Sequence, residues 1–427
     1  MINNIEYIDN TIDIKNGINI QSSKDYKDFI DLSELKTYTI DDKDSLEIDD
    51  AISLDINGSN NILWIHIACP SFYIKLNSKL DNNALLKSST TYLIDKNIYL
   101  FPEEIIKSQL SIEHGRKNPT LSLKILFNKK KDIISAEFFK ALIEPNYKLT
   151  YEEADEILDY QPKQEKELLL INEFLKSQHK KRITNGAIEL EESQGKIIEK
   201  NSQLFLKIID RTVSRKLVAE AMILYGSLFA KISKEKNILI PYRNQLEREN
   251  YNKDNNVYYE NKYVMNYLVK KSLSKSTIDI RPIKHHSLGL SEYTQVTSPI
   301  RRYIDFITQY QFICNLNGNI GLSKDELQLR INQYITAQKN IISAARESKN
   351  YNLLCWFKKQ SINEFEVTFL SWLKYEDSIA LFHFNDVYID LACKYYPPSE
   401  IVISQNILVS IDYLNSKPNL IYIKKVN

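Results

Sequence analysis

Residues 39–55 read TIDDKDSLEIDDAISLD, a segment in which acidic side chains alternate with aliphatic ones. A solvated acidic loop seldom carries regularly spaced aliphatic residues. Ile48, Ile52 and Leu54 are placed as core residues would be, so we expect the neighbouring acids at the edge of a core. Carboxylates gathered there repel one another unless a positive group joins them. The alternative is an acidic surface turn that leads into a strand, and composition alone does not separate the two.

The length and composition of the chain indicate a folded protein with more than one domain. Its 427 residues suit one large domain and a small one, or two to three ordinary domains. Hydrophobic residues make up 43% of the chain and charged residues 26%, which excludes a disordered protein. The net charge is only +1, so bulk charge predicts no polyanion, although an acidic exterior can balance a basic channel.

Membrane attachment and secretion are not expected from this sequence. No apolar stretch approaches the roughly twenty residues of a membrane-spanning helix. The first 16 residues, MINNIEYIDNTIDIKN, lack the basic start and the apolar core of a signal peptide. The four cysteines are scattered without a CxxC pair, which argues against a disulfide framework. We therefore expect a cytoplasmic protein.

The order of the sequence patterns predicts a mixed α/β (α+β) domain followed by a small all-β barrel. Residues 61–74 and 121–129 are strand-like, and helical patterns follow at 151–160, 163–182, 214–233, 298–316 and up to about residue 359. From about residue 363, five short strands suit a closed barrel of the oligonucleotide-binding (OB) type. A β-domain that serves packing alone is the alternative. The expected division is a lead-in at 1–38, a large mixed domain at 39–360 and the OB-fold barrel at 363–427.

The acidic segment contains candidate ligands for a hard divalent cation. Carboxylate oxygens favour Mg²⁺ or Mn²⁺, and four residues supply them: Asp41, Glu47, Asp49 and Asp50. An EF-hand is excluded because, counting from Asp41, the sixth position is Leu46 and the twelfth is Ile52. Zinc is disfavoured because the chain has six histidines and no HExxH motif.

A second segment, EYTQVTSPIRRYIDF at 292–306, predicts a phosphate-binding helix start. Arg301 and Arg302 are expected to begin an apolar helix behind Ser298, with Pro299 in its first turn. Helix N-termini attract phosphate, and an arginine fork can bind two phosphate oxygens. The alternative is a capped helix with surface arginines.

Glu220 is the only charged residue between Lys216 and Lys231, in a helix that is too apolar to lie on the surface. A buried carboxylate is costly unless donors reach it. The 2′-hydroxyl of a ribose is such a donor, and it distinguishes RNA from DNA. The alternative is an ion pair within the protein, with Arg215 or Lys216 as partner.

Taken together, these segments resemble the ribonuclease II family, the RNB exoribonucleases. The spacing TIDx₅ExDDA, followed far downstream by YTxxTSPIRRYxD, carries the resemblance. HIACPSFYI, TYLIDKNIYLFPEEI, KLTYEEA, NGAIEL and LVAEAMILYG lie between them in the order and approximate spacing of the family. The resemblance covers most of the chain.

The resemblance implies a processive hydrolase that removes nucleoside 5′-monophosphates from the 3′ end of single-stranded RNA, with no action on DNA. It assigns Mg²⁺ binding, with Mn²⁺ as a substitute, and orientation of the attacking water to Asp41, Glu47, Asp49 and Asp50. Arg301 would stabilise charge on the phosphate. RNA contacts are implied for Tyr92 at the terminal nucleotide, Tyr151 as a stacking ring, Glu220 at the terminal ribose, and Ser298 and Arg302 at phosphate.

The sequence departs from the family pattern at Glu47, where an aspartate is usual. The extra methylene moves the carboxylate by about 1.5 Å, and a misplacement of that size can lower a rate by about two orders of magnitude. A catalytically weakened, RNB-like RNA-binding protein is therefore the alternative function. A metal-dependent DNase or a small-molecule phosphodiesterase also stays open. The lead-in is too short for the cold-shock domains that often precede the catalytic domain, so we expect a short form with a weaker hold on RNA.

Overall fold

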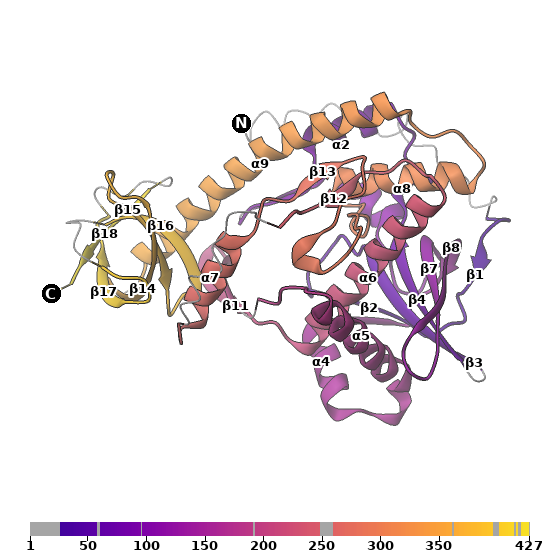
Figure 1. Ribbon diagram of the computed structural model, residues 1–427, viewed down its shortest axis with the longest axis horizontal. Helices are drawn as coiled ribbons and strands as arrows, with labels where there is room; N and C mark the ends of the chain where they lie inside the picture. Colours follow the sequence, from indigo (N-terminus) through magenta and orange to yellow (C-terminus); the bar gives the residue numbers. More distant parts are fainter. Residues whose placement is uncertain are drawn as a thin grey trace.

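The computed structural model describes residues 26–57, 60–94, 96–190, 193–247, 259–360, 363–395, 401–413, 416 and 420–426. A large body holds a seven-stranded sheet, and a small barrel lies at the other end of the molecule (Figure 1). One long helix, α9 (Lys324–Lys358), runs along the top of Figure 1 from the body to the barrel. The mixed α/β class with a C-terminal barrel is therefore confirmed. In the predicted lead-in, residues 1–25 lie outside the described part of the chain, and β1 (Ile30–Asp31) already belongs to the sheet.

The sheet is built around two long apolar strands, β4 (Asn60–Ala68) and β7 (Asn118–Phe127). Most of their residues are buried, as the alternating or continuous apolar residues of these segments predict. The strand order is β1-β8-β7-β4-β3-β2-β9, and neighbours are antiparallel except for the β1–β8 and β2–β9 pairs. The remaining strands are β2 (Thr37–Asp41), β3 (Asp50–Asn57), β8 (Ile133–Ile143) and β9 (Tyr147–Thr150).

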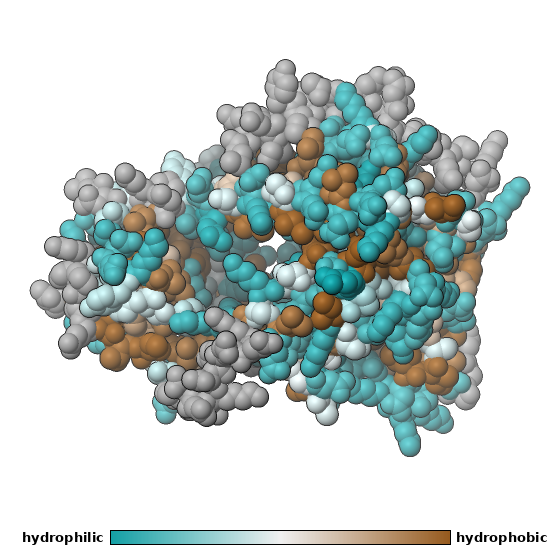
Figure 2. Space-filling view, turned by 45° about the horizontal axis from the view of Figure 1, so that its top comes forward, coloured by the Kyte–Doolittle hydropathy of each residue, from teal (hydrophilic) through white to brown (hydrophobic). Residues whose placement is uncertain are grey.

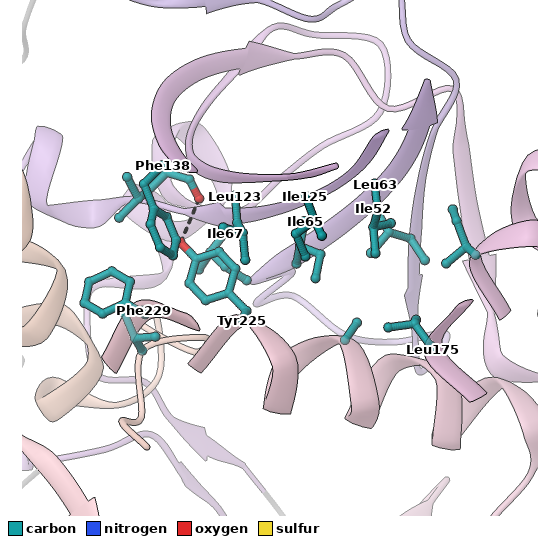
Figure 3. Close-up of a cluster of buried hydrophobic side chains, with 14 of the residues drawn as sticks. Ile52, Leu63, Ile65, Ile67, Leu123, Ile125, Phe138, Leu175, Tyr225 and Phe229 are labelled. Carbon is teal, nitrogen blue, oxygen red and sulfur yellow. Dashed lines mark hydrogen bonds between the residues drawn. The ribbon is translucent and has the colours of Figure 1, made fainter. Parts of the chain in front are cut away.

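Three helices that the sequence predicts form the first core with this sheet: α4 (Tyr151–Tyr160), α5 (Lys166–Thr184) and α6 (Val213–Glu235). Figure 3 shows sheet residues such as Ile65 and Leu123 facing Tyr225 and Phe229 of α6. The Tyr225 hydroxyl donates a hydrogen bond to the carbonyl oxygen of Leu121 at 2.9 Å, so the phenol is buried without losing its polar partner. This packing fixes α6 against the middle of the sheet.

The arginine helix begins later than the sequence predicts. α8 (Tyr303–Leu316) has Arg302 as its N-cap, so the prediction that Pro299 lies in the first helical turn is wrong. Residues 299–301 instead form a turn, in which the Arg302 N–H donates to the carbonyl oxygen of Ser298 at 2.9 Å. The Ile300 N–H donates instead to the carboxylate of Asp49 at 3.0 Å. The local prediction failed because a side chain from a distant segment holds this turn.

The C-terminal strands form the closed barrel that the sequence predicts. Its strand order is β14-β15-β16-β18-β17, and the strands are β14 (Glu364–Lys374), β15 (Ile379–Phe384), β16 (Ile389–Tyr395), β17 (Asn406–Ile411) and β18 (Ile421–Lys425). Phe357, near the end of α9, is packed into the barrel core with Phe365 and Phe384. The barrel is thus a direct continuation of the long helix.

Several elements lie outside the sequence prediction. The β10 (Gln194–Lys200) and β11 (Gln203–Ile209) hairpin and the helix α7 (Lys262–Ser272) both contact the barrel. The other short elements are η2 (Pro70–Phe72), α2 (Lys79–Lys87), β5 (Thr91–Tyr92), β6 (Asn97–Ile98), α3 (Glu103–Ile105), η3 (Ile106–Leu110), η4 (Lys163–Glu165), β12 (Tyr242–Asn244), β13 (Thr277–Asp279) and η5 (His286–Leu288). Figure 2 shows the surface hollowed between the barrel and the body. Among the helices of the described residues, none combines the length and apolarity needed to cross a membrane.

The hairpin joins the barrel at Gly195, where the two backbones approach closely. The Gly195 N–H donates to the carbonyl oxygen of Tyr388 at 2.9 Å. A Cβ atom at this position would lie 1.8 Å from the carbonyl oxygen of Val387, a distance that no side chain tolerates. Only glycine permits this contact.

Replacement of Gly195 by alanine is expected to destabilise the protein by about 1–3 kcal/mol, because the added methyl group must separate the hairpin from the barrel. The midpoint of thermal unfolding measures this effect. Gln194→Ala, a change at the exposed neighbouring position, is the control and should stay within about 0.5 kcal/mol of the wild type. Equal midpoints for the two variants would contradict the proposed contact.

Candidate active site

The acidic residues lie where β2 ends and β3 begins. Asp41 is the last residue of β2 and Asp50 the first of β3, and these strands are antiparallel, with Tyr38 opposite Ile52. The connecting loop is held from outside: the Ile48 N–H donates to the hydroxyl of Ser111 at 3.0 Å. Ile48 itself is buried in the second core. The acidic segment is therefore fixed at a core edge, as the aliphatic residues within it predict.

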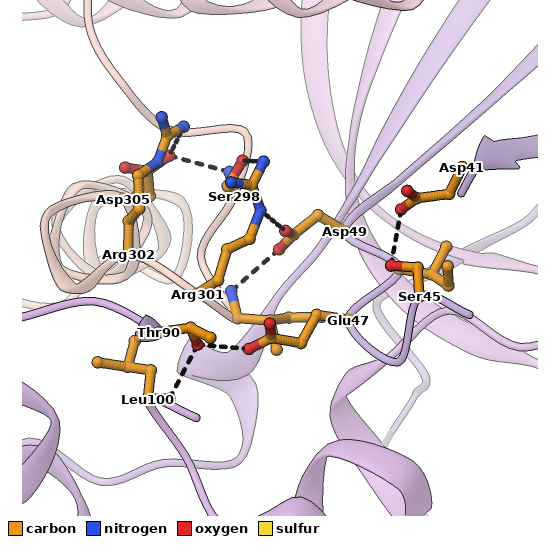
Figure 4. Close-up of polar contacts among 12 residues, drawn as sticks. Asp41, Ser45, Glu47, Asp49, Thr90, Leu100, Ser298, Arg301, Arg302 and Asp305 are labelled. Atoms are coloured by element: carbon orange, nitrogen blue, oxygen red, sulfur yellow. Dashed lines mark hydrogen bonds and ion pairs between the residues drawn. The ribbon is translucent and has the colours of Figure 1, made fainter. Parts of the chain in front are cut away.

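Asp49 and Arg301, which are 252 positions apart, form the centre of the site. The Arg301 Nε donates to the Asp49 Oδ2 at 3.0 Å, and the backbone N–H of Ile300 donates to the Oδ1 at 3.0 Å (Figure 4). The Arg301 Nη2 donates to the hydroxyl of Ser298 at 2.8 Å. The side chain of Asp49 is 3% exposed, whereas that of Arg301 is 41% exposed. The arginine is thus aimed by its buried partners while part of its guanidinium faces solvent.

Glu47 is bound by the segment that contains the predicted nucleotide-contacting tyrosine. Its Oε1 accepts a hydrogen bond from the hydroxyl of Thr90 and its Oε2 from that of Tyr92, both at 2.7 Å. The Thr90 hydroxyl also accepts from the N–H of Leu100 at 2.9 Å, and its own N–H donates to the carbonyl oxygen of Arg301 at 2.9 Å. Thr90 therefore connects Glu47 to Arg301, a role that no sequence pattern indicated.

Asp41 and Asp50 have no ion-pair partner among the described residues, unlike Asp49. The Asp41 carboxylate accepts hydrogen bonds from the Asp42 N–H at 2.7 Å and the Ser45 hydroxyl at 3.1 Å. Burial raises the pKa of Asp50 to about 7, and repulsion from Asp41 adds to that rise. No hydrogen bond from the described residues lowers it. A carboxylate in that situation is stabilised when a cation approaches.

All four acids belong to one electrostatic cluster around Arg301. Burial raises the pKa of Asp41, of Glu47 and, most strongly, of Asp49, and the Arg301 charge opposes each rise. Within the described part of the chain, no three acidic, histidine or cysteine side chains converge as a metal-binding group. Asp41 and Asp50 still fit a hard divalent cation, because Mg²⁺ is commonly held by one or two carboxylates together with water and phosphate. The assignment of Glu47 and Asp49 as ligands stays a prediction.

The predicted RNA contacts are spread around this centre. The side chain of Tyr92 is 50% exposed next to Glu47. Tyr151 lies under the guanidinium of Arg215, with 3.9 Å between the ring centre and the guanidinium carbon. Burial is the main cause that raises the pKa of the Tyr151 hydroxyl, and the charges of Asp41 and Asp50 raise it further. The tyrosine therefore lies close to Asp41 and Asp50, and its role as a stacking ring further up the RNA path stays a prediction.

Ser298 and Arg302 both donate hydrogen bonds to a buried carboxylate, that of Asp305. The Ser298 N–H donates to the buried carboxylate of Asp305 at 2.9 Å, and the Arg302 Nη2 donates to the same oxygen at 2.6 Å. The Nε of Arg302 has no hydrogen-bond partner among the described residues. The phosphate contact predicted for Arg302 would therefore have to use donors that Asp305 leaves available.

Glu220 is buried and neutralised by residues of α5. Its carboxylate accepts hydrogen bonds from the Arg182 Nε at 2.9 Å and Nη2 at 2.6 Å, and lies 3.2 Å from the Nδ1 of His179. The alternative of an internal ion pair is thus observed, but Arg215 and Lys216 were the wrong partners. They share α6 with Glu220, whereas the actual donors come from a neighbouring helix that sequence separation conceals. The predicted ribose contact remains a prediction.

The sequence comparisons agree on one family description. A family model described as "RNB domain" matches residues 29–318. A protein of Synechocystis sp. named "uncharacterized ribonuclease" is 30% identical over 393 residues, which are 91% of this chain and 58% of that protein. The chain spans about half the length of the curated relatives it matches, between 41% and 58% for the first four.

Solved structures share the fold at low sequence identity. RNase R of Mycoplasma genitalium, in complex with ribose-methylated single-stranded RNA, matches with a TM-score of 0.83 at 17% identity. The match covers 94% of this chain and 72% of that chain. Yeast Ssd1, described as a pseudonuclease, matches with a TM-score of 0.70 at 19% identity, over 87% of this chain and 51% of its own. The same fold therefore occurs in a ribonuclease and in a pseudonuclease.

Proposed function

Because the chain belongs to the RNB-domain (ribonuclease II) family, we propose that it hydrolyses single-stranded RNA from the 3′ end, releasing nucleoside 5′-monophosphates one at a time. The observation that carries this proposal is the meeting of Arg301 with Asp49, next to three further acids, across 252 positions of sequence. Such a site presents a cation-attracting cluster and a directed guanidinium side by side. Phosphodiester hydrolysis needs both, since negative charge grows on the phosphate oxygens.

Each side chain has a task that follows from its contacts. Arg301 keeps its Nη1 without an acceptor among the described residues, and this donor can bind a phosphate oxygen. Asp41 and Asp50 would hold Mg²⁺, which supplies charge neutralisation to the phosphate when bound. Tyr92, aligned by Glu47, offers a ring to the terminal nucleotide, and Tyr151 offers a second ring further along the strand. Stacking of this kind contributes about 1–3 kcal/mol per base and tolerates any sequence.

A non-catalytic RNA-binding protein is the second candidate, and the position of Glu47 favours it. Both carboxylate oxygens of Glu47 are bound by Thr90 and Tyr92, so they point toward the tyrosine segment. A protein that uses this residue only to hold Tyr92 keeps the RNA contact and loses a cation ligand. In this reading the Arg301 site would bind a phosphate without cleaving its ester.

A labelled RNA separates the two candidates. With a uniformly labelled, unstructured RNA of about 20 nucleotides, we expect shortening and release of labelled mononucleotides in MgCl₂, and neither in EDTA. The second candidate predicts binding without shortening, and recovery of cleavage in Glu47→Asp, whose shorter side chain leaves Thr90 and moves toward the other acids. Asp42→Asn, an exposed change in the same loop, is the control and should cleave like the wild type. Shortening of a matched DNA would contradict the substrate assignment.

A further inference from the structure

The outer face of the barrel carries a buried histidine with an unpartnered ring nitrogen. His383 lies on β15 between Phe382 and Phe384, both fully buried in the barrel core, so the two-residue period of a strand directs His383 outward. It is nevertheless only 3% exposed. Its Nδ1 lies 2.7 Å from the carboxylate of Asp390, and its Nε2 is buried with no hydrogen-bond partner. The carboxylate can only accept, so Nδ1 carries the hydrogen and Nε2 of the neutral ring is an unused acceptor.

A tyrosine from the body covers this histidine. The Tyr263 ring of α7 stacks on the His383 ring with centres 3.8 Å apart and planes at 17°. The Tyr388 ring, from the β15–β16 turn, lies beside the Tyr263 ring in an edge contact, with the two ring centres 6.1 Å apart and their planes at 72°. The N-cap of α7, Asn261, donates to the hydroxyl of Thr368 on β14 at 3.4 Å. Figure 1 shows α7 lying next to the barrel.

The covered surface is formed by the second and third strands of the barrel. In five-stranded barrels of this type, that face binds oligonucleotides. A flat ring stacked on a histidine has the geometry of a bound base. The face of His383 therefore offers the geometry of a base-binding site, and the Tyr263 ring covers that face.

We propose that His383, with Tyr388 at the border, forms a stacking site for one unpaired RNA base, and that Tyr263 occupies this site until RNA displaces it. The inference rests on the proposed RNA-binding function and adds a site to it. The unused Nε2 acceptor lies in the plane of the His383 ring, so it suits a donor at the ring edge, such as a ribose 2′-hydroxyl, and not the stacked base itself. RNA bound here would be held at the barrel while its 3′ end enters the body.

Helix α7 is short, which suits such an exchange. The helix has 11 residues, and only Val264 and Asn266 among them are buried. Lys262 lies 5.1 Å above the Tyr263 ring, so a positive charge would remain beside RNA phosphates after the ring has left. A competing internal contact lowers the measured affinity by the fraction of molecules in which the site is open. Removal of the occupant should therefore strengthen RNA binding.

The test measures affinity of the intact chain for a fluorescein-labelled 12-nucleotide oligoadenylate by anisotropy, in EDTA so that hydrolysis does not interfere. Tyr263→Ala, which keeps helix propensity, is expected to lower Kd about tenfold. Tyr263→Phe keeps the stacked ring and should stay within about twofold of the wild type. His383→Ala, introduced into Tyr263→Ala, should cancel the gain. Circular dichroism of each variant establishes that it is folded.

The outcomes separate this inference from the proposed function. An unchanged or higher Kd in Tyr263→Ala, with the wild type binding RNA, overturns the occupied site and leaves the exoribonuclease proposal standing. A gain that survives loss of His383 also overturns it, because the base must then bind elsewhere. If neither the wild type nor Tyr263→Ala binds RNA, both proposals fail together.

Discussion

Asp49→Asn is expected to lower the rate of RNA hydrolysis by about 100- to 1,000-fold. The carboxylate of Asp49 accepts hydrogen bonds from the Ile300 N–H and the Arg301 Nε on its two oxygens. An amide offers one oxygen, and its NH₂ group would face one of these two donors. The turn at Ile300 and the direction of Arg301 then change together. Single-turnover rates on labelled RNA measure the effect.

The same variant should be less stable, by about 1–3 kcal/mol. Breaking a buried ion pair costs more than that, but Arg301 is 41% exposed and water screens its remaining charge. Asp42→Asn is the matched control, since it removes one negative charge from the same loop. Asp42 forms a solvent-exposed ion pair with Arg215 at 2.8 Å. Such a pair contributes at most about 1 kcal/mol to the free energy of unfolding. A rate for Asp49→Asn within tenfold of the control would contradict the role assigned to the Asp49–Arg301 pair.

Asp50→Asn is expected to abolish hydrolysis as well, yet to stabilise the folded protein above neutral pH. The folded-state pKa of Asp50 is raised to about 7, whereas an unfolded aspartate titrates near 3.8. Below the lower value the carboxyl is protonated in both states, and folding carries no penalty. Between the two values the unfolded state has released its proton and the folded state retains it, so folding must take up a proton, which becomes less favourable as the pH rises. Stability therefore falls with rising pH, by up to about 4 kcal/mol without a divalent cation.

Thermal unfolding in EDTA at pH 5 and pH 8 tests this sign. The wild type should lose more stability between the two pH values than Asp50→Asn does. Addition of MgCl₂ at pH 8 should restore stability to the wild type and leave the variant unchanged, because a bound cation stabilises the state that binds it. This readout does not depend on cleavage. Equal pH dependence in both proteins, with no effect of Mg²⁺ on either, would remove Asp50 from the cation site.

The acidic segment and the arginine motif could be joined from sequence because both carry strong local patterns. Aliphatic residues such as Ile48 marked a core edge, and the sequence TSPIRRY marked a chemically distinct turn. The direct contact between Asp49 and Arg301 was not predictable in detail, because the acids were assigned to a cation and the arginine to a phosphate, and neither assignment brings the two side chains into contact. Thr90 escaped notice because a single threonine hydroxyl carries no pattern that distinguishes it from other threonines.

The elements that were missed are those whose stability comes from contacts far along the chain. The β10–β11 hairpin has weak alternation of apolar residues and depends on the close approach at Gly195. Helix α7 is short, and it is held against the barrel by Tyr263 and Asn261. The partner of Glu220 was sought on its own helix, whereas Arg182 comes from α5. In each case the sequence shows the residue but not the neighbour that defines its role.

Helix α9 sets the distance between the barrel and the body of the molecule. It is one continuous helix of 35 residues, and its exposed middle, near Ile342 and Arg346, is less supported than its ends in the two cores. Each residue inserted there would turn the barrel by about 100° and shift it by about 1.5 Å relative to the acids. For an RNA bound as proposed, at the barrel and at Arg301 together, the distance and rotation between the two sites would depend on the length of this helix, so an insertion or deletion in it would change the alignment of the RNA without touching a nucleotide.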